Sequence, residues 1–263
     1  MTETLSAGDE AIVEIEGLAY GGNGVGRIGR RVVFTPYAAP GDRAVVVIRD
    51  VRRTYLVGDI KEIIVPSAER TQPRCPLFYR CGGCSYQHLN YAAQCEWKER
   101  QVRDSLTRIG GMVNPPVESL IPSPEPYRYR GKAEYHWAPG DGGALSMGFL
   151  DVSGRALIDV VSCHIVRESI DEAVFSLRER CRIDDAAPRD RRLIFWSGYS
   201  YRESHFIERQ VKEKTFRVPY SGFFQANLVL AERLVDEVMA LAAPGPSDTV
   251  LDCYCGAGLF SLF

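Results

Sequence analysis

Three cysteines within one short stretch constrain the fold of this chain more than any other feature. They are Cys75, Cys81 and Cys84, with the spacing C-x5-C-x2-C, and Gly82 and Gly83 separate the last two. Because glycine adopts positive φ without strain, the Gly-Gly pair allows a tight turn that aims neighbouring thiolates at one point. Soft metals select such ligands. Free cysteines also occur as small buried residues, but that reading suits an isolated cysteine better than three around a turn. The spacing therefore predicts a metal site.

The later cysteines are the candidates for a fourth ligand: Cys95, Cys163, Cys181, Cys253 and Cys255. Cys163 follows an apolar run, residues 157–161, that is expected to be a strand. A zinc ribbon would normally carry a second C-x2-C pair, and none follows. One compact group of cysteines plus a single distant one is a pattern that iron–sulfur proteins tolerate. The spacing favours a cluster, although four thiolates also suit tetrahedral zinc.

Composition is that of a soluble globular protein, with 263 residues, 45% hydrophobic and 25% charged. No run approaches the roughly 18 apolar residues of a membrane span. Eight cysteines without an export signal indicate a reducing cytoplasm. The net charge of −2 carries no nucleic-acid signature, so any such signal must come from the charge distribution.

The N-terminal part predicts a small β-barrel. Residues 11–18, 32–34, 44–48 and 55–64 have the composition of strands, and four glycines in residues 20–26 indicate a tight turn or bulge. Short strands at this spacing, over about 65 residues, suit an OB-like barrel, which has five strands.

Arginines gather in the same region, where residues 27–53 contain seven arginines and two aspartates. Such a surface is expected to bind phosphates, although a charged run can also be merely solvated. RNA binding is favoured because all seven are arginines on a fold that often holds nucleic acid. The candidate contacts are Arg27, Arg30, Arg31, Arg52 and Arg53.

The central part predicts a mixture of helices and strands. Apolar spacing predicts a helix over residues 91–109 with this buried stripe: Tyr91, Cys95, Lys98, Val102, Leu106 and Ile109. Residues 169–182 predict a second helix, while 148–150 with 157–161, and 193–198 with 204–208, are expected to form strand pairs.

Residues 127–136 alternate aromatic and basic side chains. This alternation suits a platform for single-stranded RNA, on which bases stack and Arg128, Arg130 and Lys132 contact phosphates. A half-buried strand with a charged outer face produces the same alternation, so both interpretations stand.

The C-terminal part has the pattern of a nucleoside-binding turn. A helix is expected over residues 228–241, and residues 249–260 predict a strand, a glycine turn and a helix start. In Rossmann-like folds glycines at such a turn let the backbone approach a cofactor. A single G-x-G pair is by itself weak support for a nucleoside-binding site.

A family resemblance joins these parts. Residues 15–27 and 39–43 resemble a TRAM domain, an RNA-binding barrel. A TRAM-like barrel followed by C-x5-C-x2-C resembles the bacterial 5-methyluridine RNA methyltransferases that contain an iron–sulfur cluster. The resemblance implies that a [4Fe–4S] cluster is bound by Cys75, Cys81, Cys84 and Cys163. TRAM-containing radical enzymes that modify tRNA have C-x3-C-x2-C instead, from which this spacing departs.

The resemblance also implies an S-adenosyl-L-methionine site. Gln225 and Tyr254 match cofactor positions, and the flanking matches are Phe223, Asn227, Asp252, Gly256 and Gly258. The expected fold class is mixed α+β and α/β. It comprises an OB-like barrel (1–66), a central α+β iron–sulfur domain (67–217) and the start of a Rossmann-like methyltransferase domain (218–263).

The implied activity is methylation of uridine C5 in RNA, ribosomal RNA rather than tRNA, by a cytoplasmic monomer that does not enter membranes. Uracil C5 is a poor nucleophile, so this reaction needs a thiolate at C6 and a base. In the family both lie beyond the position of Phe263, so we expect an N-terminal portion without catalytic residues, in which Cys253 and Cys255 pack as small residues. The alternative is a non-catalytic RNA-binding module with a four-cysteine metal site.

Overall fold

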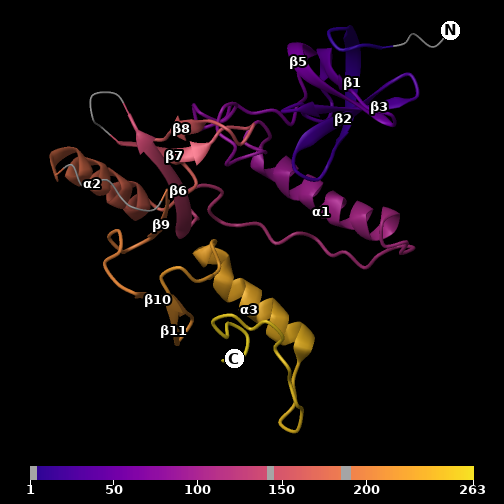
Figure 1. Ribbon diagram of the computed structural model, residues 1–263. Coiled ribbons are helices and arrows are strands. Elements are labelled where there is room, and N and C mark those ends of the chain that lie inside the picture. The colour runs from indigo at the N-terminus through magenta and orange to yellow at the C-terminus, as the bar shows by residue number, and fades with distance from the viewer. Residues whose placement is uncertain (1–4, 141–144, 185–190) are drawn as a thin grey trace. The chain divides into compact units, whose positions relative to one another are not determined.

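The computed structural model describes residues 5–140, 145–184 and 191–263 (Figure 1). They form two compact units, Met1–Pro122 and Ser123–Phe263. The division into three domains stays a prediction. In the described part of the chain, no helix has both the length and the apolar character that crossing a bilayer requires.

A closed five-stranded barrel begins the first unit, as predicted (indigo to purple in Figure 1). Its strands are β1 (Glu10–Leu18), β2 (Asn23–Ile28), β3 (Arg31–Pro36), β4 (Arg43–Val51) and β5 (Tyr55–Val65). Their order is β1-β2-β3-β5-β4, in which only the contact of β3 with β5 is parallel. Alternate apolar side chains fill the interior, with Val13, Val33, Val46 and Leu56 fully buried.

Half of the glycine-rich stretch predicted as a turn is strand β2. Built onto Gly24, a Cβ would lie 2.7 Å from the Cβ of Ala38, and on Gly26 it would lie 2.4 Å from Cγ1 of Val13. Glycine is required inside this strand because other backbone and side-chain atoms approach it closely. The predicted turn between strands is formed by residues 20–22, where the amide of Gly22 donates to the carbonyl of Ala19 at 3.0 Å. The register shift of this strand pair lies in β1, between Ile15 and Gly17.

Helix α1 (Tyr91–Arg108) is confirmed, but its predicted buried stripe is wrong. The buried residues, spaced four apart, are Ala93, Trp97 and Gln101. Val102 is 52% exposed. The indole of Trp97 packs with Leu18, and the amide of Gln101 donates to the carbonyl of Leu18 at 3.2 Å. The helix therefore covers the end of β1 with one aromatic and one polar side chain, which an apolar count along the sequence does not detect.

The second unit contains a sheet and a hairpin with two helices. The sheet has the antiparallel order β8 (Leu157–Asp159), β7 (Leu145–Leu150), β6 (Lys132–Pro139) and β9 (Arg192–Trp196). Helix α2 (Glu168–Asp184) packs on β7 and β9, and α3 (Leu228–Ala242) packs on the hairpin of β10 (Phe206–Val211) and β11 (Lys214–Pro219).

Two strand predictions for this unit need correction. The pairing of residues 193–198 with 204–208 is wrong, because β9 pairs with β6 and β10 pairs with β11. A two-residue connection in which Lys212 has φ 51° closes the latter hairpin. The strand predicted over 127–136 begins only at Lys132.

Candidate functional site

The three clustered cysteines lie in turns that follow the barrel. The amide of Phe78 donates to the carbonyl of Cys75 at 3.1 Å, and that of Cys81 donates to the carbonyl of Leu77 at 2.8 Å. The ring of Phe78 is buried and stacks on His88 with centroids 5.7 Å apart. One buried aromatic side chain thus anchors the loop between the first two cysteines, whose thiols are free and half-buried.

Hydrogen bonding around Cys81 fits a sulfur ligand. The amide of Gly83 donates to Cys81 Sγ at 3.4 Å, as amides do to cluster-bound thiolates. Burial is the main cause that raises the pKa of Cys81. The Gly83 amide opposes this shift, and the charge of Cys75 adds to it.

Cys163 belongs to the other unit, where it is buried at the end of the loop that follows β8. Within the described residues of the chain, no group of three or more His, Cys, Asp or Glu side chains is arranged to hold a metal ion. Binding of one metal centre by all four cysteines therefore stays a prediction.

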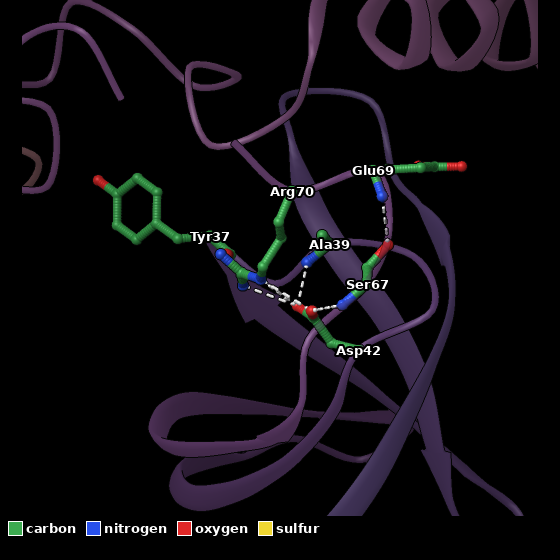
Figure 2. Close-up of polar contacts among 6 residues, drawn as sticks. All are labelled: Tyr37, Ala39, Asp42, Ser67, Glu69 and Arg70. Atoms are coloured by element: carbon green, nitrogen blue, oxygen red, sulfur yellow. Dashed lines mark hydrogen bonds and ion pairs between the residues drawn. The ribbon is translucent and has the colours of Figure 1, made fainter. Parts of the chain in front are cut away.

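A buried ion pair ties the barrel to the segment that leads to the cysteines (Figure 2). Asp42, in the turn before β4, is fully buried and forms a bidentate pair with Arg70, at 2.7 Å from Nε to Oδ1 and 2.7 Å from Nη2 to Oδ2. The same carboxylate accepts from the amides of Ala39 at 2.6 Å and Ser67 at 2.9 Å. Nη2 of Arg70 also donates to the carbonyl of Tyr37 at 2.8 Å. Every lone-pair direction of Asp42 is used within the protein.

Four of the five barrel arginines predicted to bind RNA meet at one end of the barrel. Arg30 and Arg31 lie at the turn between β2 and β3, and Arg52 and Arg53 lie between β4 and β5. Nη2 of Arg31 donates to the carbonyl of Arg52, so the two turns are adjacent. Arg30 and Arg53 are exposed. The structure thus turns two separate stretches into one cationic surface, which we call the arginine end.

Acidic partners accompany some of these arginines. Arg52 lies 2.6 Å from Asp50, and Arg27, on β2, lies 3.8 Å from Glu16. All four side chains are more than two-fifths exposed, and exposed pairs of this kind contribute only about 0–1 kcal/mol. The two arginines can therefore exchange these partners for phosphates at little cost.

The second group of predicted RNA contacts is engaged inside its own unit. Nη1 of Arg128 donates to Asp171 Oδ2 at 2.6 Å, and its side chain is only 25% exposed. Arg130 Nε donates to the carbonyl of Lys132 at 2.9 Å. Lys132 Nζ donates to the carbonyl of Gly222 at 2.7 Å, and burial is the main cause that lowers its pKa. The half-buried interpretation of this stretch describes these cations better than an RNA platform does.

The residues around Gln225 form a loop before α3. Asn227 caps this helix by accepting from the amide of Leu230 at 3.2 Å. Phe224 is buried against Phe216, whereas Phe223 is 70% exposed and Gln225 is half-buried. The loop thus buries the ring of Phe224 and exposes the ring of Phe223.

The predicted strand and helix of residues 249–260 are not formed. Within the described residues this stretch consists of turns, and Leu251 is 83% exposed. A first Rossmann strand is stabilised by parallel neighbours, and the described sheets offer it none. The turn itself is confirmed, because Gly256 and Gly258 have φ of 59° and 77°.

Tyr254 and the two C-terminal cysteines face solvent. Tyr254 is fully exposed, while Asp252 accepts from Ser261 Oγ at 2.6 Å. Cys253 and Cys255 are exposed as well, so the expectation that they pack as small residues is wrong.

Sequence reasoning missed Asp42, Arg70 and Asp171. Asp42 lies in the Ala39–Arg43 segment, which resembles part of a TRAM domain. The sequence therefore indicated the turn but not the ion pair with Arg70. Asp171 stands in the first turn of α2, where a carboxylate also suits the helix dipole. No spacing rule links any of these residues to partners dozens of positions away.

The chain is similar to known proteins, in part or over nearly its whole length. Residues 7–61 match the TRAM domain family. An uncharacterized RNA methyltransferase from Synechocystis sp. is 40% identical over 151 residues, which cover 57% of this chain and 33% of that protein. The 23S rRNA (uracil(1939)-C(5))-methyltransferase RlmD of Methylococcus capsulatus is 28% identical over 298 residues, covering 94% of this chain and 67% of that protein.

A solved structure shares the fold. The tRNA (uracil-54, C5)-methyltransferase of Pyrococcus abyssi, in complex with S-adenosyl-L-homocysteine, superposes with a TM-score of 0.66 at 20% identity. The superposition covers 95% of this chain and 69% of that one. The chain therefore spans between a third and about two thirds of the length of these relatives.

Proposed function

Because this chain belongs to the RNA methyltransferases that carry a TRAM domain, we propose that it serves S-adenosylmethionine-dependent methylation of uridine C5 in RNA. The observation that carries the proposal is the closed barrel over the TRAM match, in a chain that aligns almost throughout with a uracil-C5 methyltransferase. S-adenosylmethionine supplies the methyl group. The substrate is ribosomal RNA rather than tRNA, and the protein acts as a cytoplasmic monomer.

The barrel binds RNA through the arginine end. Two pairs of adjacent arginines there present planar guanidinium groups that match phosphate geometry. Arg27 and Arg52 form weak, exposed ion pairs with Glu16 and Asp50, which RNA phosphates can replace. The binding is sequence-independent in this part of the protein, because phosphates carry no base information.

Two cofactor sites follow. Cys75, Cys81, Cys84 and Cys163 hold a [4Fe–4S] cluster, which the amide of Gly83 beside Cys81 supports. Gln225 and Tyr254 contact S-adenosylmethionine, with Phe223 as an exposed ring beside the first, and Asn227, Asp252, Gly256 and Gly258 shape the backbone around it.

Loss of 5-methyluridine from a deletion strain tests the activity. Ribosomal RNA and tRNA are purified separately, digested and scanned by mass spectrometry, and the strain is complemented with wild-type or Gln225→Ala protein. We expect the nucleoside to disappear from large-subunit ribosomal RNA and to return only with the wild type. Loss from tRNA alone would correct the substrate. No loss from either, with RNA binding intact, would favour the non-catalytic module.

Mössbauer spectroscopy of anaerobically purified protein tests the cluster. We expect the spectrum of a [4Fe–4S] centre in the wild type and its loss in Cys163→Ser. A zinc-containing, iron-free protein with the same stability would refute the cluster while leaving the methyltransferase proposal open.

A further inference from the structure

One short segment, residues 127–132, lies between the loop of Cys163 and the loop of Gln225. We call this segment the strap; the Cys163 loop is residues 160–167 and the Gln225 loop is residues 220–227. Along one edge the strap pairs with the Cys163 loop. The amide of Arg128 donates to the carbonyl of His164 at 3.0 Å, and the amide of Arg130 donates to that of Ile165 at 2.8 Å.

The side chain of Arg128 strengthens this edge. Its Nη1 donates to the carbonyls of Cys163 at 2.9 Å and Val166 at 3.2 Å, and its Nη2 donates to Ser162 Oγ at 3.2 Å. The positive φ of 56° at Arg128 is uncommon for a residue with a side chain. Such a conformation persists where surrounding contacts hold it, and these hydrogen bonds supply them.

Asp171 of α2 completes the arrangement. Its Oδ2 accepts from Arg128 and from Ser162 Oγ at 2.8 Å, and its Oδ1 accepts from the amide of Cys163 at 3.1 Å. The side chain of Asp171 is 16% exposed. The backbone of Cys163 is therefore bonded on both sides, at its carbonyl by Arg128 and at its amide by Asp171.

The other edge of the strap meets the Gln225 loop. The amide of Gly131 donates to the carbonyl of Ala226 at 2.7 Å, and Arg130 forms an isolated bridge with Asn227. A Cβ on Gly131 would lie 2.5 Å from Cδ1 of Leu228, the first residue of α3. A larger residue at this position would force the side chain of Leu228 to move.

Lys132 extends the second edge. Its Nζ donates to the carbonyl of Gly222 at 2.7 Å and lies 4.9 Å from the ring centroid of Trp196, which is fully buried. A cation held against a buried aromatic ring and a carbonyl is a fixed attachment point rather than a mobile surface lysine.

We propose that Arg128 and Lys132 are positioning residues through which the strap couples the Cys163 loop to the Gln225 loop. Disturbing one edge of the strap loosens the loop on the opposite edge. Its functional meaning rests on the proposed function: the cysteine that binds the cluster and the glutamine that contacts S-adenosylmethionine are held by one six-residue segment, so the state of one site influences the other.

Hydrogen exchange measured by mass spectrometry tests the coupling without either cofactor. In the purified full chain, Arg128→Met is expected to raise exchange at least fivefold in the Cys163 loop and also in the Gln225 loop, which Arg128 does not touch. Lys132→Met removes the contact with the Gln225 loop and should raise exchange in the same two loops. Arg128→Lys keeps a cation opposite Asp171 and should restore most of the protection. The hairpin β10–β11 should be unchanged in all three.

Arg192→Met is the matched control. Arg192 lies on β9, the strand that pairs with β6, which contains Lys132. The side chain of Arg192 is 71% exposed and lies 3.5 Å from its partner Glu134. This variant should leave both loops as protected as in the wild type. A rise confined to the loop that the mutated residue contacts would overturn the proposal. If Arg128→Met lowers protection everywhere by global unfolding, Arg128→Lys and Lys132→Met give the decisive comparison.

Binding of S-adenosylmethionine, measured by equilibrium dialysis, is the second readout. We expect Arg128→Met to raise its Kd at least threefold and Arg128→Lys to restore it, which a role limited to the Cys163 loop would not produce. If the wild type binds no S-adenosylmethionine, the proposed function fails while the exchange experiment still decides the coupling.

Discussion

Two stretches of this chain are both rich in basic residues, but the side chains of one face solvent and those of the other are engaged inside the protein. Residues 27–53 place arginines on exposed turns of a barrel, where ion pairs are weak. Residues 128–132 direct their cations to carbonyls, a carboxylate and an aromatic ring of the same unit. The difference shows that a basic stretch of sequence does not by itself reveal whether its cations stay accessible to a nucleic acid.

The largest effect on the free energy of unfolding is expected from a change in the buried ion pair of Asp42 and Arg70. Asp42→Asn places an amide donor among the amides of Ala39 and Ser67 and removes the charge opposite Arg70. Breaking one partner of a buried pair costs about 3–5 kcal/mol, so the free energy of unfolding should fall by that amount in urea titrations.

Arg30→Met is the matched outward control, and its effect should stay within about 0.5 kcal/mol. Equal losses for the two variants would contradict the distinction between inward and outward charges.

A buried base provides the next test of how the unfolding free energy depends on burial, at His88. Burial, and then the charge of Arg70, lower its pKa to about 4. Because the folded pKa lies below the ordinary value of 6.5, the folded state disfavours protonation. The stabilisation is fully present above pH 6.5, falls as the pH drops from 6.5 to 4, and changes no further below that. A shift of this size corresponds to roughly 3 kcal/mol.

His88→Phe keeps a ring on Phe78 and cannot titrate. The difference in unfolding free energy between the two proteins, measured from pH 7.5 to pH 3.5, isolates this histidine from the carboxylates. A difference that does not vary with pH would show that His88 is accessible to protons in the folded protein.

The smallest effect concerns RNA affinity. Arg30→Gln with Arg53→Gln should weaken binding of a single-stranded RNA by about tenfold at low salt and make the salt dependence of log K less steep by about one to two units. Fluorescence anisotropy over a salt series measures both quantities.

Arg130→Gln is the comparison variant from the inward stretch, and it should leave the affinity and the slope unchanged. If it weakens binding as much as the barrel variant does, residues 128–132 contact RNA after all.

Local signals predicted most elements of the fold. Alternation and turn residues identified the barrel, three- and four-residue spacing identified α1 and α3, and the glycines near the C-terminus identified a turn with positive φ. Each of these depends on residues close together in the chain. The predictions that failed required knowledge of a partner: which face of α1 is buried depends on Leu18, and which strands pair depends on the hairpin closed at Lys212.

The candidate sites divide in the same way. Residue chemistry alone marked the cysteine group and the basic stretches, whereas the Gln225 loop was identified through the resemblance to a family. Only the folded chain brought Arg31 beside Arg52, buried Asp42 against Arg70, and placed the strap between the loops of Cys163 and Gln225. These contacts join residues from 21 to 95 positions apart. Residue type states which interactions a side chain can form, but packing and the exclusion of water decide which of them it does form.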